Sequence, residues 1–218
     1  MDAKPISFVD DARRASRELL RRFDALPKGG VPAAVERLEL RARLETLEAL
    51  DRQYGGNARL ELEDAAELVA SIVVDLARID DADLVIGVAL WALRHAVAIE
   101  APEPVVNALA THSNRATGRE ELAAVLALMH AVIGNVGPRL AADLERSNPE
   151  RPWRILHANL AITAIRTEDA GLMDAAFDAL DAALPAERDS FYAEARALAL
   201  APGISSVVRE RIEARIQA

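Results

Sequence analysis

Apolar side chains recur at intervals of three or four residues along nearly the whole chain, and this interval is the period of an α-helix. The first such segment, residues 7–24, carries a single apolar stripe made of Phe8, Ala12, Ala15, Leu19 and Phe23. No segment alternates apolar and polar residues with an excess of β-branched side chains, which is the pattern of a strand. The sequence therefore predicts an all-α protein.

Proline and glycine divide the periodic segments at short intervals. We expect helices over residues 7–24, 32–54, 62–79, 82–99, 102–112, 117–134, 138–147, 153–166, 169–184, 186–200 and 204–216. Residues 112–115 are expected to form a polar loop, and residues 134–137 to end a helix before Pro138. Short loops between consecutive helices favour antiparallel pairs. The predicted fold is all-α, with antiparallel helical hairpins stacked as an irregular α-solenoid or a multi-helix bundle.

Aromatic residues make up only 4% of the chain, so the core must consist of small and medium aliphatic side chains, which suit closely packed helices. Three expected helices are apolar almost all round, at residues 84–99, 122–133 and 155–165, and such helices lie inside a multi-layer packing. The uncharged run 122–138 is shorter than the roughly 20 residues of a membrane-spanning helix. Because it also contains His130 and Asn135, we interpret it as a buried helix.

Charge is distributed unevenly along the chain. Residues 1–57 contain 11 basic and 10 acidic residues, whereas residues 58–218 contain 15 basic and 25 acidic residues. The change coincides with the strongest break in the helical pattern, at residues 55–57. We therefore predict a charged N-terminal helical hairpin at 1–57 and an apolar-cored helical-hairpin domain at 58–218. The overall charge of −9 disfavours general nucleic-acid binding because it repels phosphate groups.

The chain contains no cysteine, which excludes disulfide bonds and thiolate metal sites. Residues 1–8 show no basic segment followed by an apolar run, so we expect no signal peptide and a cytoplasmic location. Only Lys4 and Lys28 among the 26 basic residues are lysines, which we interpret as the codon bias of a GC-rich bacterial genome.

Residues 153–185 carry a pattern of aromatic, aliphatic and proline residues. Trp153 precedes Leu156 by three positions and Phe177 precedes Pro185 by eight, while Leu180, between the last two, occupies a position where tetratricopeptide units prefer alanine. This segment resembles a tetratricopeptide unit, although the interval from Trp153 to Phe177 is about one helical turn longer than in that family. The resemblance implies a curved helical stack with a groove that binds peptide segments. A non-repetitive helical domain is the alternative.

Three of the four histidines, His95, His130 and His157, each lie on one of the most apolar predicted helices. Imidazoles converging from facing helices can bind zinc or another divalent metal. No His-x-x-x-His or Glu-x-x-His pair accompanies them, so the favoured interpretation is core histidines bonded to carbonyl groups or water. We therefore expect no metal and no cofactor.

Asp75 lies within an apolar run, residues 68–79, where a buried carboxylate near Arg94 or His95 would have a shifted pKa. Its neighbours at helical spacing are polar, which instead favours a solvated stripe on one helix face. Asp75 and Arg94 are therefore candidate interaction residues rather than catalytic ones.

Arginines cluster on the first predicted helix, where their spacing places Arg14, Arg17 and Arg21 on one face. Such a cluster suits an acidic partner, but intrachain pairing or solvation is the favoured interpretation. The same region, residues 1–57, is a candidate for self-association, with the helix at 31–54 pairing with its copy.

The sequence contains no glycine-rich phosphate loop, no Gly-x-Ser-x-Gly turn and no cysteine nucleophile. We expect a non-enzymatic protein–protein interaction or scaffold domain of adaptor or chaperone type, which binds a protein or a peptide. The alternative is a small-molecule-binding protein or an enzyme whose inter-helix pocket uses His95, His130 or His157. A pocket converging on these histidines would favour the alternative, and a filled core with an open face would favour the scaffold.

Overall fold

The computed structural model describes residues 18–27, 34–54, 63–140 and 152–217, and within these ranges it contains helices and no strand. The helices are α2 (Leu19–Ala25), α3 (Ala34–Gln53), α4 (Glu63–Ala77), α5 (Ala82–Arg94), α6 (Pro102–Arg115), α7 (Arg119–Leu140), α8 (Pro152–Thr167), α9 (Ala170–Ala183), α10 (Arg188–Ala199) and α11 (Ser206–Gln217). The prediction of an all-α fold is confirmed.

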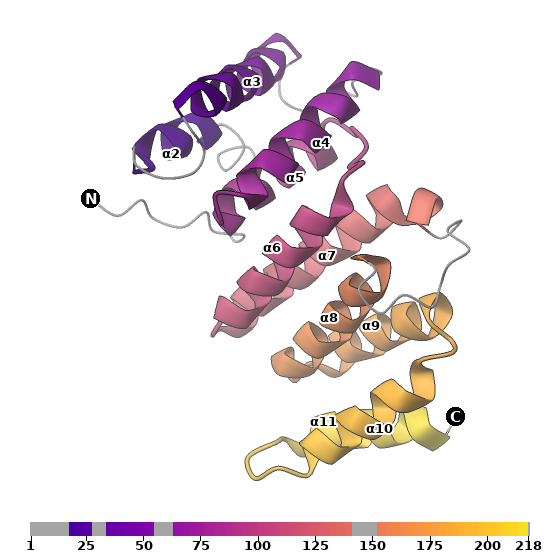
Figure 1. Ribbon diagram of the computed structural model, residues 1–218. Coiled ribbons are helices and arrows are strands. Elements are labelled where there is room, and N and C mark those ends of the chain that lie inside the picture. Colours follow the sequence, from indigo (N-terminus) through magenta and orange to yellow (C-terminus); the bar gives the residue numbers. More distant parts are fainter. Residues whose placement is uncertain (1–17, 28–33, 55–62, 141–151, 218) are drawn as a thin grey trace.

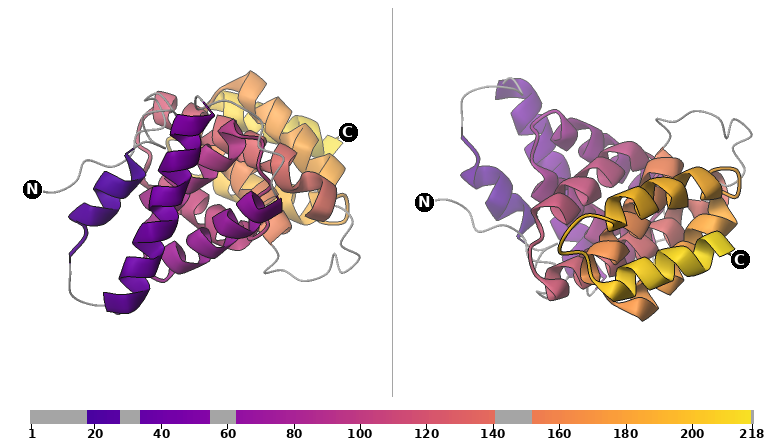
Figure 2. Two further views of the ribbon diagram at one scale, coloured as in Figure 1. Left: turned by 90° about the horizontal axis from the view of Figure 1, so that it is seen from above. Right: turned by 90° about the horizontal axis from the view of Figure 1, so that it is seen from below.

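Consecutive helices from α2 to α9 pack against each other, as do α10 and α11, and the resulting pairs are stacked in chain order, with α11 in contact with α9. Figure 1 shows α2 and α3 at one end of the stack and α10 and α11 at the other. The two end-on views in Figure 2 confirm that these pairs lie on opposite sides of the molecule. Among the described helices, none has both the length and the hydropathy required to cross a lipid bilayer.

One continuous hydrophobic core runs through the stack and consists mainly of aliphatic side chains. Leu19 and Phe23 of α2 belong to it, so the N-terminal helices pack on the rest of the molecule. Trp91 of α5 is fully buried, and its indole nitrogen donates a hydrogen bond of 3.1 Å to the Leu47 carbonyl of α3. The proposed division at residues 55–57 lies outside the described residues and stays a prediction.

The helix expected at 82–99 ends earlier, at Arg94. The amide of Val97 donates to the Ala92 carbonyl and the amide of Ala96 donates to the Leu93 carbonyl, which is the hydrogen-bond pattern of a Schellman motif. Ala96 has the left-handed φ of 54° that this motif requires. Because glycine usually occupies that position, the sequence contained no signal for the end of the helix.

Two further expectations about helix ends are wrong. Residues 112–115 belong to α6 rather than to a polar loop, and α7 continues through Gly134 and Pro138 to Leu140. The side chain of Asn135 holds α7 against the segment between α5 and α6. Its amide oxygen accepts from the Ile99 amide and its amide nitrogen donates to the Val97 carbonyl, both at 2.9 Å. Tertiary contacts here override the local preference of glycine and proline.

The apolar stripe of α3 changes at its C-terminal end. Leu40, Leu44 and Leu47 are fully buried, but Tyr54, seven residues after Leu47, is 40% exposed. Asp51 instead continues the buried face one turn after Leu47 and is only 5% exposed. A carboxylate on the core-facing side of α3 requires a partner, because an unpaired buried charge is strongly unfavourable.

Candidate functional site

The described residues form an apolar groove between α8 and the α10–α11 pair, with a cavity volume of about 430 Å³. We call it the C-terminal groove. Its apolar walls are formed by three helices. The apolar residues of the walls are Ile155, Ala158, Ile162 and Ile165 from α8, Phe191, Ala195 and Leu198 from α10, and Val208 and Ile212 from α11. On α8 they follow one another at helical spacing, so they form a stripe along one helix face.

The groove exists because α8 and α10 do not pack closely together. α8 packs against α6, α7 and α9, and α10 packs against α11, which in turn contacts α9. The α10–α11 pair is therefore attached to the stack by the contact of α11 with α9, and the face of α8 that is directed toward α10 is left uncovered. Figure 2 shows this pair at one end of the described stack.

Large apolar side chains are exposed in and beside the C-terminal groove. Ile162 within it is 46% exposed, and Leu198 at its edge is 74% exposed. Leu200, two residues after Leu198, is 73% exposed. Exposed apolar side chains that stand alone are ordinary, but a cluster around a concave surface makes the groove a candidate binding site.

Polar residues define the two ends and the middle of the groove. At one end Arg154 forms an ion pair with Glu187, which joins the start of α8 to the start of α10. At the other end Arg166 donates to the carbonyl oxygens of Ser113 and, at 2.8 Å, Ala116, where α6 ends. Among the described residues no ion pair is found for Glu194, which lies between these ends on α10.

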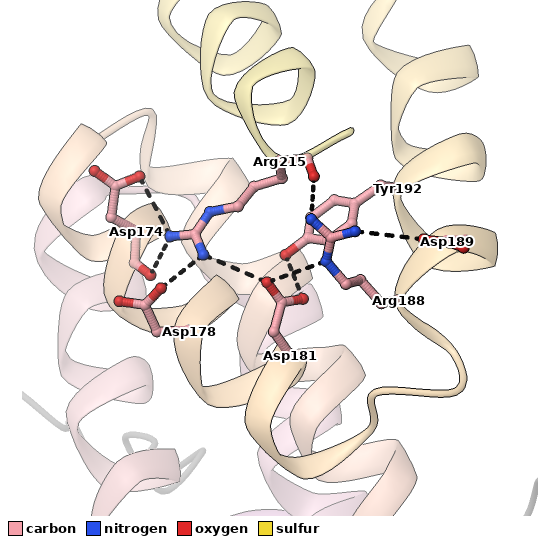
Figure 3. A network of polar contacts seen from close by, with 7 residues as sticks. All are labelled: Asp174, Asp178, Asp181, Arg188, Asp189, Tyr192 and Arg215. Carbon is pink, nitrogen blue, oxygen red and sulfur yellow. Dashed lines mark hydrogen bonds and ion pairs between the residues drawn. The ribbon is translucent and has the colours of Figure 1, made fainter. Parts of the chain in front are cut away.

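A network of charged residues, shown in Figure 3, attaches the α10–α11 pair to α9. We call it the C-terminal clasp. Arg215 of α11 is 2.6 Å from Asp178 and 3.4 Å from Asp181, and it donates to the Asp174 carbonyl at 3.1 Å. Arg188 at the start of α10 pairs with Asp181 at 3.6 Å.

Aromatic residues support the same attachment from the core side. The Tyr192 ring meets the Phe177 ring edge to face at 5.3 Å, and its hydroxyl donates to Asp181 at 3.0 Å. Burial raises the pKa of Tyr192, and the hydrogen bond to Asp181 adds to this effect. The phenol is therefore neutral over the whole physiological range and acts as a hydrogen-bond donor.

The three histidines considered as metal ligands differ in their contacts. His95 is fully buried, and its Nε2 atom is 3.0 Å from an Asp51 oxygen that also contacts Arg94 at 2.9 Å. Arg94 and His95 therefore share Asp51, and not Asp75. Asp51 was missed because a charged residue in a charged helix suggests solvent, although its place one turn after Leu47 was a detectable signal.

His130 lies on α7 and His157 on α8. The Nδ1 atom of His157 is 3.0 Å from the Trp153 carbonyl oxygen, and the two rings meet at 4.1 Å. Burial lowers the pKa of both histidines, and the charge of His130 also lowers that of His157. Neither His95, His130 nor His157 lines the C-terminal groove. Across the described ranges, no three His, Cys, Asp or Glu side chains are grouped closely enough to hold a metal ion.

His112 was expected in a loop but lies in α6, with its Nε2 atom 2.7 Å from Asp83 on α5. Arg22 of α2 forms an ion pair with the second oxygen of Asp83. Burial raises the pKa of Asp83, but the contact with His112 and the positive charge of Arg22 outweigh it, so this pKa lies below its usual value. Arg22, Asp83 and His112 therefore join α2, α5 and α6 and are largely shielded from solvent, which indicates a structural role.

The remaining candidates occupy the surface. Asp75 pairs with Arg43 at 2.6 Å and with Arg78 at 3.8 Å, and all three side chains are partly exposed. Arg21 is 80% exposed and lies 3.3 Å from Glu18. Arg14 and Arg17 lie outside the described residues.

No family model, no curated protein and no solved structure matches this chain. The resemblance to a tetratricopeptide unit therefore stays a prediction. The α8–α9 pair covers most of residues 153–185 and buries Leu156, Phe177 and Leu180, but any packed helical hairpin would bury such residues. The function must be argued from the geometry of the chain itself.

Proposed function

We propose that this protein is a non-enzymatic interaction domain of adaptor or chaperone type, which binds a segment of another protein in the C-terminal groove. The observation that carries the proposal is the apolar stripe of α8, left uncovered opposite α10. Exposed apolar side chains lie in a concave surface between rigid helices, which is how helical proteins hold partner segments.

The polar groups around the groove support binding rather than chemistry. Arg154 and Arg166 are engaged by Glu187 and by backbone carbonyl groups, so both serve to fix the walls. The lining offers Asn159 and Glu194 as polar contacts, and a partner segment requires only a few such groups for orientation.

The test compares two substitutions that introduce the same charge at equally exposed β-branched residues. Ile162 in the groove is 46% exposed and Val74 on α4, outside the groove, is 47% exposed. Affinity capture from the native cell is performed with the full chain, with Ile162→Glu and with Val74→Glu. We expect a partner that is retained by wild type and Val74→Glu and is lost with Ile162→Glu.

A partner that is retained equally by all three chains would contradict the proposal, because it would bind elsewhere. Circular dichroism and thermal unfolding of Ile162→Glu establish that the variant is folded. A folded variant that has lost its partner then reports on the groove and not on stability.

A small-molecule-binding protein or enzyme is the second candidate, because about 430 Å³ lies within the roughly 300–1,000 Å³ of ligand pockets. The histidines expected to serve such a pocket do not line it, which makes this candidate the weaker one. If this alternative holds, the small-molecule fraction of a cell extract should raise the unfolding temperature of the wild type but not that of Ile162→Glu.

Self-association through residues 1–57 is a further proposal, supported by Leu38 of α3, which is 67% exposed. Native mass spectrometry of the full chain and of Leu38→Glu tests it directly. The proposal requires an oligomer in the wild type that is weakened by the substitution.

A further inference from the structure

We propose that the interface between α7 and α8 is an acid-sensitive joint of the stack, at which protonation of His157 beside His130 loosens the packing of α8. The proposal concerns the chain itself and holds with or without a partner in the C-terminal groove. It follows from the place of α8 in the stack, from the burial of His157 and from the charges around it.

α8 connects the two halves of the stack. It packs against α6, α7 and α9, whereas α9, α10 and α11 make their main contacts with one another and with α8. The half formed by α2 to α7 and the half formed by α9 to α11 are therefore joined mainly through α8. A change in the packing of α8 on α7 alters the position of one half relative to the other.

His157 is buried on α8, with only 2% of its surface exposed. Its Nδ1 atom is 3.0 Å from the Trp153 carbonyl oxygen, and because a carbonyl oxygen only accepts hydrogen bonds, Nδ1 carries the proton of the neutral ring. The Trp153 ring meets the imidazole edge to face at 4.1 Å. A second proton is therefore taken up at Nε2, and it creates a cation inside the packed helices, which is unfavourable unless a negative charge balances it.

No such negative charge is placed beside this ring. The two histidines of the N-terminal half each contact an aspartate, at 3.0 Å and 2.7 Å. In the part of the chain that the structure describes, neither His157 nor His130 forms an ion pair with a carboxylate. The charge that acts on His157 is that of His130 on α7, which is positive when His130 is protonated and then repels a second cation.

The other charged groups near α8 are occupied elsewhere or lie on other parts of their helices. They are Glu103, His112 and Arg115 on α6, Arg119, Glu120 and Glu121 on α7, Arg154 and Arg166 on α8 itself, and Asp174, Asp178 and Asp181 on α9. The three aspartates of α9 are engaged by Arg215 in the C-terminal clasp. The two arginines of α8 are held by Glu187 and by carbonyl oxygens at the end of α6.

The direction of the pH effect follows from these surroundings. Burial lowers the pKa of His157 below its ordinary value of 6.5, the hydrogen bond to Trp153 opposes this, and the charge of His130 lowers the pKa further. Burial also lowers the pKa of His130. The folded chain therefore binds these protons more weakly than the unfolded chain does. The packing of α8 is fully stable above pH 6.5 and weakens as the pH falls from 6.5 through the lower, folded values.

Nuclear magnetic resonance of the histidine ring protons in the full chain tests the charges directly. Titration between about pH 5 and pH 8 gives a midpoint for each ring, and His157→Phe and His130→Gln assign the signals. We expect the midpoint of His157 to lie below 6.5 and to move upward in His130→Gln, because a positive neighbour has been removed. A midpoint at or above 6.5 in the wild type, or no movement in His130→Gln, would overturn the proposal.

A distance measurement tests the joint. Because the chain has no cysteine, Ala49→Cys on α3 and Ala214→Cys on α11, both exposed, provide two unique sites for spin labels, one in each half. We expect the distribution of distances between the labels to broaden reversibly between about pH 7.5 and pH 5. The same labels in His157→Phe should keep the narrower distribution at both pH values, since phenylalanine retains an aromatic ring but takes up no proton.

An identical distribution at both pH values in the labelled wild type would contradict the proposal, as would a broadening that persists in His157→Phe. Circular dichroism at pH 5 must still show a helical chain, because loss of helix throughout would mean global unfolding and not a local joint. If His157→Phe is not folded at neutral pH, His130→Gln replaces it. This variant changes an exposed residue and should broaden less than the wild type at pH 5, so equal broadening would overturn the proposal.

Discussion

The two ends of the stack are joined to its middle in different ways. At the N-terminal end, α2 and α3 are attached by buried groups in which an aspartate, a histidine and an arginine meet, and Leu19, Phe23 and Leu44 of these helices are fully buried. At the C-terminal end, α10 and α11 are attached by the partly exposed C-terminal clasp, and the space beside α8 remains open.

The way in which each end is attached determines how much it contributes to the stability of the chain and how accessible its surface is to a partner. Enclosed ion pairs hold helices in one arrangement because a broken pair would leave a charge without water. Solvated ion pairs cost little to rearrange, so the helices they attach can adjust when something enters the groove beside them. We therefore expect the N-terminal end to determine the stability of the chain and the C-terminal end to determine its interactions.

The largest effect is expected for Asp51→Ala. It leaves Arg94 and His95 enclosed without their shared carboxylate, and loss of one partner from a buried pair costs about 3–5 kcal/mol. The free energy of unfolding in urea measures this loss. The control is Asp75→Ala, which removes a carboxylate from the partly exposed pair with Arg43 and should cost less than about 1 kcal/mol. Equal losses of unfolding free energy in the two variants would contradict the distinction between buried and partly exposed ion pairs.

A smaller effect, about 2 kcal/mol at neutral pH, is expected for Asp83→Asn, which removes the charge that contacts His112 and Arg22. The pKa of Asp83 is lower in the folded chain than its ordinary value of 3.8. The stability it contributes is therefore present above pH 3.8 and is lost as the pH falls through the lower, folded value. Urea unfolding between pH 2 and pH 7 should show a steeper acid loss in the wild type than in Asp83→Asn. An equal loss of unfolding free energy at low pH in the wild type and in Asp83→Asn would contradict this prediction.

Arg215→Met should cost about 1–2 kcal/mol, because it removes the clasp contacts to Asp178 and Asp181 while keeping much of the side-chain volume. The loss should be local. Hydrogen exchange followed by mass spectrometry is expected to quicken in α10 and α11 and to remain unchanged in α3 and α5. Faster exchange throughout the chain would show that the two ends unfold as one unit.

The smallest effect on stability, less than about 0.5 kcal/mol, is expected for Ile162→Glu, because this side chain is already half exposed. The same substitution is expected to have the largest effect on partner binding. A loss of stability comparable to that of Asp51→Ala would show that the groove is part of the core and not a binding surface.

Most of the fold was predictable because it depends on local signals. Apolar periodicity placed helices close to α8, α9, α10 and α11, and proline and aspartate marked where several helices begin. The errors occurred where a tertiary contact replaced the local signal. Ala96 adopts a left-handed conformation that sequence patterns assign to glycine, and Asn135 supports α7 where glycine and proline suggest an end.

The candidate site was less predictable. The apolar residues of α8 were assigned to a buried helix, since nothing in the spacing of Ile155, Ile162 or Ile165 distinguishes a covered face from an uncovered one. The distinction depends on the distance between α8 and α10, which the clasp on the far side of the pair determines. Asp51 and His112 were missed for a related reason: their partners, His95 and Asp83, lie 44 and 29 positions away in the sequence.

Two buried ion-pair groups, one around Asp83 and one around His95, limit where residues can be inserted into or deleted from this chain. Asp83 lies in the first turn of α5 and His95 directly follows its last residue, so a rod of twelve residues, about 18 Å, separates the two enclosed groups. One residue inserted between them would rotate one end by about 100° relative to the other, and only one group could keep its geometry. α5 therefore acts as a spacer of fixed length, and insertions and deletions should be tolerated in the connections around it but not within it.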